Sequence, residues 1–335
     1  MKNFSAPQFL VSLLLLGFIA LTSQAQTIRR VNNNGITGTA IYATIQLAHD
    51  AAANGDIIQL EPSTTTYGNL TCTKQLTFVG TGYFLSENQP PALQASVITA
   101  TVGQVTFTTG SSGSSMSGLT TGGVYFGASN LIFQRNYVSG TTLYVNYNVA
   151  TTNNVIRQNY LYNMSYNTGL ATNNLLITNN IIQLDANVSA AAFTGEFSNN
   201  IVLRYAYFDG FTARNNYFGN TLSTTANTTW QYNLLGQATL PTLGSQSNNT
   251  ANVPTSSVFV LAPTAPGQFD AWYKLKAGSP AIGAGVGGVD VGAYGSATGF
   301  AYRIAGIPAI PTIYQLTQTV SGNTLNVNVS TRSNN

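Results

Sequence analysis

Residues 156–161 read IRQNYL, and five further segments of the chain share this pattern. They are FQRNYV at 133–138, ITNNII at 177–182, FSNNIV at 197–202, ARNNYF at 213–218 and WQYNLL at 230–235. The aligned asparagines are Asn136, Asn159, Asn180, Asn200, Asn216 and Asn233, at steps of 23, 21, 20, 16 and 17 residues. These steps are too short for a strand–helix–strand unit of roughly 30 residues. The pattern is typical of a solenoid of short strands.

Two positions of the repeat are apolar in all six copies. The third residue before the asparagine is Phe133, Ile156, Ile177, Phe197, Ala213 or Trp230, and the second after it is Val138, Leu161, Ile182, Val202, Phe218 or Leu235. These positions predict inward-facing side chains. The asparagine is expected at a bend, because Asn tolerates left-handed backbone. Its amide both donates and accepts, so the six asparagines are predicted to form a ladder from coil to coil.

The segments on either side of the repeats predict special ends. Residues 42–53 have a helical period and end near Asn54-Gly55, which predicts a short capping helix before a first strand at 56–60. Near the C-terminus, Ile313–Val320 and Thr324–Thr331 flank Ser321-Gly322-Asn323 and predict a β-hairpin after the proline-rich residues 307–311. Two roles stay open for this hairpin: a terminal cap or edge cover, and a secretion or surface-attachment signal.

Motifs near both ends resemble those of secreted bacterial β-helix proteins of the pectin-lyase-like superfamily. They are TIQ at 44–46, GDII at 55–58, LTFVG at 76–80, LKAGSPAIGAG at 275–285 and DVGAY at 290–294. The resemblance covers about residues 40–297. It implies a right-handed parallel β-helix with an N-terminal capping helix. At ~20 residues per coil about ten coils are expected, so the predicted fold class is all-β, a right-handed parallel β-helix with the N-terminal capping helix and the C-terminal β-hairpin. The expected divisions are a signal peptide at 1–25, a cap at 26–56, the β-helix with its closing segment at 57–297, and the linker and hairpin at 298–335.

The N-terminus predicts secretion. Lys2 precedes an apolar run at 9–21, and Ser23-Gln24-Ala25 supplies a small-x-small cleavage site. The alternative is a membrane anchor, but the run is shorter than the ~20 residues that span a bilayer. No membrane span is therefore expected after cleavage, and the protein is expected to be secreted or on the cell surface. Cys72 is the only cysteine, so an internal disulfide is excluded.

Charge is scarce throughout the 335 residues. Only 6% of them are charged, and 12 Lys and Arg against nine Asp and Glu give a net charge of +3. So few basic residues argue against nucleic-acid binding. Between residues 133 and 235 the carboxylates are Asp185, Glu196 and Asp209, with no Lys or His. No cofactor or metal site is expected, and a structural role is expected for His49, the one histidine.

The fold resemblance implies polysaccharide lyases, which use clustered carboxylates around Ca²⁺ and an Arg or Lys base, or hydrolases, which use clustered Asp. The repeats lack such clusters, so we assign no catalytic residue. The candidate binding residues are charged or aromatic: Arg204, Tyr205, Tyr207, Asp209, Arg214, Tyr144 and Tyr166. Surface ion pairs and loop packing are the alternative roles for these side chains. The sequence favours a non-catalytic glycan-binding, adhesive or structural module whose partner is a polysaccharide or cell-surface glycan. The alternative is a divergent polysaccharide lyase or glycoside hydrolase.

Overall fold

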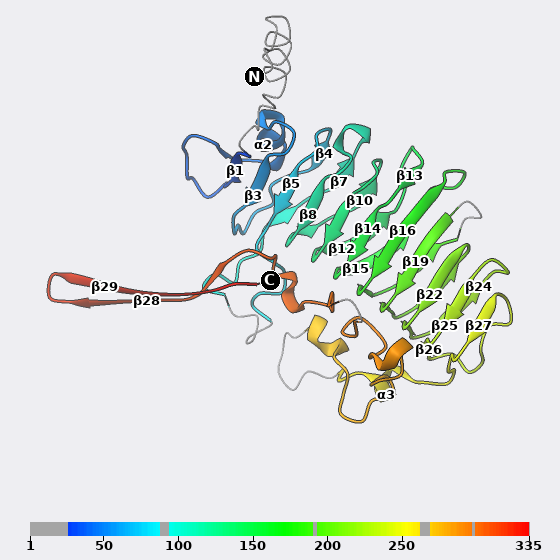
Figure 1. The fold of residues 1–335 in the computed structure, drawn as a ribbon. Helices are drawn as coiled ribbons and strands as arrows, with labels where there is room; N and C mark the ends of the chain where they lie inside the picture. The colour runs from blue at the N-terminus through cyan, green and yellow to red at the C-terminus, as the bar shows by residue number, and fades with distance from the viewer. Residues whose placement is uncertain (1–25, 88–93, 190–192, 262–268, 297–298, 335) are drawn as a thin grey trace, which may run out of the picture.

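The computed structural model describes residues 26–87, 94–189, 193–261, 269–296 and 299–334, so the predicted signal peptide lies outside the described residues. The chain winds into a parallel β-helix (Figure 1), as the repeats predict. Each coil contributes strands to three faces. The first face stacks β3 (Ile57–Leu60), β5 (Thr77–Val79), β8 (Ser115–Ser117), β11 (Ile132–Gln134), β14 (Val155–Arg157), β16 (Thr172–Thr178), β19 (Phe193–Ser198), β22 (Phe211–Arg214), β25 (Thr229–Gln231) and β27 (Ser245–Ser247).

The other two faces belong to a second sheet, which β12 (Tyr137–Tyr144) and β15 (Tyr160–Ser165) join by running through both. The second face comprises β6 (Thr101–Val102), β9 (Thr120–Thr121), the starts of β12 and β15, β17 (Ile181–Ile182), β20 (Ile201–Val202), β23 (Tyr217–Phe218) and β26 (Leu234–Leu235). The third face comprises β4 (Leu70–Cys72), β7 (Val105–Phe107), β10 (Val124–Phe126), the ends of β12 and β15, β18 (Ala186–Val188), β21 (Tyr205–Phe208) and β24 (Thr221–Thr224). From β3 to β27 the ten first-face strands make nine turns, close to the expected number of coils.

The core lies between the faces, where both apolar columns of the repeat are buried. Ile156, Ile177 and Trp230 from the first face are fully covered, as are Leu161 and Ile182 from the second. Because the strands pair in parallel and in register, equivalent side chains of successive coils lie side by side, for example Ile156 beside Ile177. The core is therefore continuous along the solenoid, and each coil depends on its neighbours for burial.

The N-terminal end is closed by the predicted helix, α2 (Ile45–Ala51). The Thr44 hydroxyl accepts the Leu47 N–H at 3.2 Å and caps the helix, while Ile45 and Ala48 are buried against the core. At its other end Lys74 Nζ donates to three carbonyl oxygens, those of His49, Asp50 and Ala52, at 2.8–3.0 Å.

The parallel sheet begins earlier than the sequence predicts. Strand β1 (Ile28–Val31) pairs in parallel with β3, and β2 (Ile41–Tyr42) pairs with β1. The region expected to act only as a cap therefore also adds strands to the first face.

The repeat asparagines line one bend, between the first and second faces, and Asn136, Asn159, Asn180, Asn200, Asn216 and Asn233 are all fully buried. Asn180 is representative. Its Oδ1 accepts the Asn159 side-chain and backbone N–H groups, both at 3.0 Å, and its Nδ2 donates to Asn200 Oδ1 at 3.0 Å and to the Ile156 carbonyl at 2.9 Å. The same side-chain bonds link Asn136 to Asn233 rung by rung. The buried backbone N–H and C=O groups of the bend thereby find hydrogen-bond partners without any charged side chain.

The left-handed residue of this bend is not the ladder asparagine but the residue before it, which corrects the sequence-based expectation. Arg135, Gln158, Asn179, Asn199, Asn215 and Tyr232 have φ between 53° and 57°. The ladder position requires an amide because it must bridge two coils, whereas the preceding position requires only tolerance of positive φ. That difference explains why Arg, Gln and Tyr occur at the position before the ladder asparagine and never at the ladder position itself.

The closing segment does not sit on the end of the last coil. Residues 281–296 and 299–307, here called the C-terminal strap, run back along the second face in the direction opposite to coil growth (Figure 1, orange). The side chains of the residues with positive φ hold this strap. Asn215 Oδ1 accepts the Val286 N–H, Asn179 Nδ2 donates to Ala293, and Gln158 Nε2 donates to the Ala301 carbonyl at 2.6 Å.

An apolar layer fills the space between the second face and the segments that cover it. The residue just after each ladder asparagine points outward into this layer; these residues are Tyr137, Tyr160, Ile181, Ile201, Tyr217 and Leu234. They pack against Phe259, Tyr273, Val291, Ala293 and Tyr302 from the later chain. Both residues of β17, β20, β23 and β26 are buried for this reason, as expected for a parallel sheet covered on both sides.

The predicted hairpin is present as β28 (Thr312–Ser321) and β29 (Thr324–Arg332). It projects away from the β-helix (Figure 1), and Val320 near its tip is 75% exposed. An edge cover would bury apolar side chains against a sheet edge, so the expectation of a cap or edge cover is wrong.

Candidate functional site

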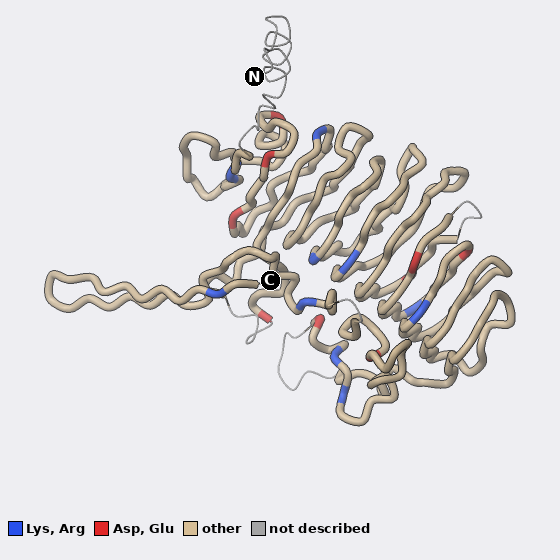
Figure 2. Tube along the Cα trace, in the orientation of Figure 1, with Lys and Arg blue, Asp and Glu red and all other residues tan. Residues whose placement is uncertain are grey.

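Two faces of the β-helix are open to solvent, the first and the third, because the strap covers the second. Charged residues are sparse along all three faces (Figure 2). The predicted binding residues divide between the open faces.

The third face carries outward tyrosines. Tyr125 and Tyr144 are register partners on β10 and β12, and their rings stack at 5.2 Å between centroids with 8° between the planes. Tyr205 and Tyr207 on β21 are 47% and 42% exposed. Strand pairing puts Asn187 beside Tyr207, so amides and phenol rings share this surface. Such a surface offers stacking and hydrogen bonding to a neutral ligand.

Arg204, Asp209 and Arg214 are not brought together. Arg204 pairs with Asp185 at 3.0 Å on the third face and lies over the Tyr205 ring at 5.0 Å. Arg214 ends β22 on the first face and pairs with Glu196. Asp209 accepts hydrogen bonds from Thr225 Oγ1 at 2.6 Å and Asn227 Nδ2 at 3.1 Å in the turn after β21. These three candidate binding residues therefore take part in three separate local contacts.

Tyr166 belongs to the packing of its own coil. Its ring meets Phe193 edge to face at 5.2 Å, and its hydroxyl donates to the Ser189 carbonyl at 2.7 Å. Both the ring and the hydroxyl are thus engaged within the fold, and Tyr166 is less exposed than Tyr205 and Tyr207.

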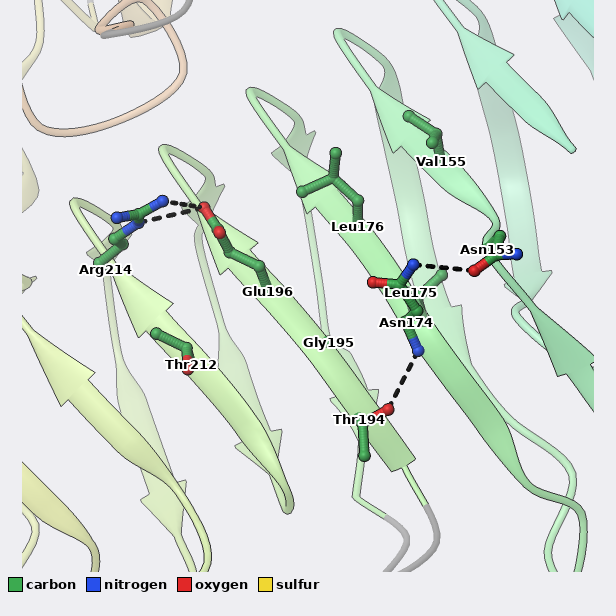
Figure 3. A pocket seen from close by; sticks show the side chains of 10 residues that line it. All are labelled: Asn153, Val155, Asn174, Leu175, Leu176, Thr194, Gly195, Glu196, Thr212 and Arg214. Atoms are coloured by element: carbon green, nitrogen blue, oxygen red, sulfur yellow. Dashed lines mark hydrogen bonds and ion pairs between the residues drawn. The ribbon is translucent and has the colours of Figure 1, made fainter. Parts of the chain in front are cut away.

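The first face holds an open hollow of about 640 Å³ that the sequence does not reveal (Figure 3). Its lining is neutral polar and apolar apart from one ion pair: Asn153, Asn174, Thr194, Thr212, Val155, Leu175, Leu176 and Gly195, with Glu196 and Arg214. Arg214 donates to Glu196 Oε1 through Nε at 3.1 Å and through Nη2 at 2.8 Å. Only glycine fits at position 195 of this lining, since a Cβ there would lie 2.1 Å from the Leu175 carbonyl oxygen and 2.9 Å from the Phe211 ring.

A second, exposed asparagine ladder forms one rim of the hollow. Asn153 Nδ2 donates to Asn130 Oδ1 at 3.1 Å, and Asn174 Nδ2 donates to Asn153 Oδ1 at 2.8 Å. All three have positive φ, between 51° and 59°. Their amides therefore lie at the surface, where a ligand has access to them, unlike those of the buried ladder.

The hollow is poorly equipped for acid–base chemistry. Glu196 is the one carboxylate in its lining, whereas glycosidases use two carboxyl groups ≈5–9.5 Å apart. In the described part of the chain, no three His, Cys, Asp or Glu side chains gather as a metal site would require. Burial raises the pKa of the Cys72 thiol to about 11, which keeps it protonated and unreactive.

His49 lies in the N-terminal cap, where its Nε2 accepts the Thr73 N–H at 3.0 Å and its Nδ1 lies 2.8 Å from Asp50 Oδ1. Among the described residues, no helix is long and apolar enough to cross a membrane.

Comparison with known proteins adds a fold likeness only. No family model and no curated protein matches the chain. Among solved structures, the chain is similar to pectate lyase Pel9A, with a TM-score of 0.33 and 14% identity over 81% of this chain and 96% of that chain. Likeness at this level carries no assignment of activity, and architecture alone does not fix chemistry.

Proposed function

We propose that this protein is a secreted or cell-surface, non-catalytic β-helix that binds a neutral polysaccharide, with the first-face hollow as its primary site. The observation that carries the proposal is the lining of that hollow. Surface amides of Asn153 and Asn174 and hydroxyls of Thr194 and Thr212 stand beside apolar Val155 and Leu176. Sugars present alternating hydroxyl and C–H surfaces, and this lining suits both.

The ion pair in the hollow favours a neutral ligand over an acidic one. Arg214 is the basic residue of the lining, and two of its nitrogens already donate to Glu196. A uronate would have to compete with that carboxylate for the same cation. A neutral chain needs no such exchange, because amides and hydroxyls both donate and accept.

The third-face tyrosines supply a second contact surface in this proposal. Tyr205 and Tyr207 are exposed, and the Tyr125–Tyr144 stack lies on the same face three strand steps before Tyr207. At ~4.8 Å per step, the two groups are about 14 Å apart, which suits an extended ligand better than a single sugar.

Binding is tested by a glycan array followed by calorimetry with neutral glucans, pectin and alginate. Asn174→Gly removes a rim amide while keeping a residue that accepts positive φ, so weaker binding is expected without loss of folding. Asn148→Gly is the matched control, since Asn148 also has positive φ but lies outside the hollow. Tyr205→Ala with Tyr207→Ala probes the third face separately. Absence of binding to every glycan would overturn the proposal.

The alternative is a divergent lyase or hydrolase, and the same protein tests it. Incubation with each polysaccharide is expected to yield neither unsaturated products nor new reducing ends. Turnover abolished by Glu196→Gln would establish an enzyme and refute the non-catalytic assignment. Turnover unaffected by Glu196→Gln and Arg214→Gln would relocate the chemistry outside the hollow and refute the assignment equally.

A further inference from the structure

The C-terminal hairpin has one apolar face and one polar face. The register pairs Leu316 with Val329, Gln318 with Val327 and Val320 with Leu325, so these side chains share a face. The opposite face carries Gln315, Thr317, Thr319, Asn326, Asn328 and Ser330. A strand pattern of this kind belongs to a sheet with one covered side.

Nothing in the described chain covers the apolar face. Leu316, Val320, Leu325, Val327 and Val329 are 46–75% exposed, and the hairpin extends away from the coils (Figure 1). Its base is fixed: Asn334 Nδ2 donates to the Ile310 carbonyl at 2.7 Å, and the Ala95 N–H donates to the Ile313 carbonyl at 3.0 Å. A two-stranded hairpin is marginally stable alone in water, so this one requires a partner surface.

The absence of charge indicates what that partner is. Residues 312–331 contain no Asp, Glu, Lys or Arg, and Figure 2 shows the projecting part without a charged residue beyond its base. A charged partner would find no complementary group on this face. An identical face can pack on it about a two-fold axis with no like-charge repulsion, since the same residues meet from both sides.

We propose that the hairpin is a homodimerisation element, in which the apolar faces of two hairpins pack against each other. Each polar face stays in water, and the two sheets lie about 10 Å apart as in a small β-sandwich. Strands of ten and nine residues give an interface at most about 30 Å long and two strands wide. That is below the standard size of ~800 Å² per partner, so the dimer dissociates on dilution. Two projecting hairpins joined in this way would place two β-helices in one particle.

The test is sedimentation velocity on the full mature chain over a range from low to high micromolar. Wild-type protein is expected to shift from monomer to dimer as concentration rises. Val327→Lys puts a charge on the apolar face of both partners and is expected to raise the dissociation constant about tenfold or more. Asn328→Lys is the matched control, because it places the same charge on the next residue but on the polar face. It is expected to leave the dissociation constant unchanged.

Hydrogen exchange on wild-type protein guards against a variant that merely unfolds the hairpin. Amides of β28 and β29 are expected to become more protected as concentration rises, while those of the β-helix stay constant. A wild-type chain that stays monomeric at the highest concentration overturns the proposal, as does equal disruption by Val327→Lys and Asn328→Lys. Flotation of the wild-type chain with phosphatidylcholine vesicles would assign the apolar face to a lipid surface and also overturn it.

Discussion

The side-chain amide nitrogen of Asn179 lies 2.9 Å from the carbonyl oxygen of Ala293 and 2.6 Å from that of Gly295. One buried side chain thereby ties the third repeat to a segment more than a hundred residues later in the chain. Asn199 does the same one coil on, with its Nδ2 at 3.1 Å from the Asp290 carbonyl. The bend that reverses each coil is therefore also the attachment line of the C-terminal strap.

Removal of one attachment is expected to loosen the strap locally. Asn179→Gly deletes both hydrogen bonds but keeps a residue suited to φ of 57°, so the bend itself is not strained. We expect faster exchange of strap amides, such as the Tyr302 N–H that donates to Ala293, and earlier proteolysis between residues 281 and 307. Asn153→Gly, at an exposed left-handed position away from the strap, is the control. Equal behaviour of the two variants would show that the side-chain bonds of Asn179 do not hold the strap.

The buried ladder is expected to be far more sensitive than the exposed one. Asn180→Ala leaves the backbone and side-chain N–H groups of Asn159 without the acceptor that they share inside the core. Each buried unsatisfied group costs about 1–3 kcal/mol, so a loss of at least about 2 kcal/mol in unfolding free energy is expected.

Asn174→Gly is the comparison for the ladder, because Asn174 makes similar amide bonds at the surface, where water replaces them. Chemical denaturation of both variants measures the difference. Losses of similar size would mean that the Asn180 bonds derive no special value from burial.

The fold could be predicted because every coil of a solenoid needs the same inward apolar positions, so the same pattern recurs along the sequence. Ile156 and Leu161 mark the inward positions of one coil, and the same columns recur in five other segments. The sequence pattern did not identify Asn249 as the last rung of the buried ladder. Asn249 Oδ1 accepts from Asn233 Nδ2 at 2.9 Å, but the third residue before Asn249 is Gln246, where the earlier coils have an apolar residue. A terminal coil has no further coil to stack on, so the pattern fades there.

The strap was missed although the sequence carried a signal for it. Tyr160, Ile181, Ile201 and Tyr217 follow the ladder asparagines directly and are as apolar as the inward column. Adjacent apolar residues on a short strand indicate cover on both sides. The first-face hollow left no such signal, because Asn153, Asn174 and Glu196 come from three different coils and meet only in the folded chain.

Metal removal is expected to leave stability unchanged. A Ca²⁺ site takes 6–8 oxygen ligands, usually including several carboxylates. Asp185 and Glu196 are instead each paired with an arginine, Arg204 and Arg214, and Asp209 accepts hydrogen bonds from Thr225 and Asn227. Thermal melts with and without a chelator should coincide. A fall of several degrees in the chelator would reveal a structural ion.

Acid is expected to weaken the N-terminal cap through Asp56. This buried carboxylate accepts the Ala53 N–H at 3.0 Å, the Thr27 N–H at 3.1 Å and Arg29 Nε at 2.8 Å. Burial alone would raise its pKa, but these donors and the Arg29 charge outweigh burial and hold the pKa below its ordinary value. Because the folded-state pKa is depressed, the stabilisation is present above the unfolded-state pKa near 4 and is lost as pH falls through the folded-state value.

The measurement is the melting temperature between pH 7 and pH 2.5 for wild type and Asp56→Asn. Wild type should lose melting temperature steeply below about pH 4, where unfolded Asp56 begins to bind a proton that the folded state resists. The variant should melt lower at pH 7, because Arg29 has lost its charged partner, and should fall less steeply in acid. Asp50, whose pKa is lowered by its hydrogen bonds from His49 and Gln46, leaves the variant some residual slope. Parallel curves for the two proteins would show that Asp56 does not link the cap to pH.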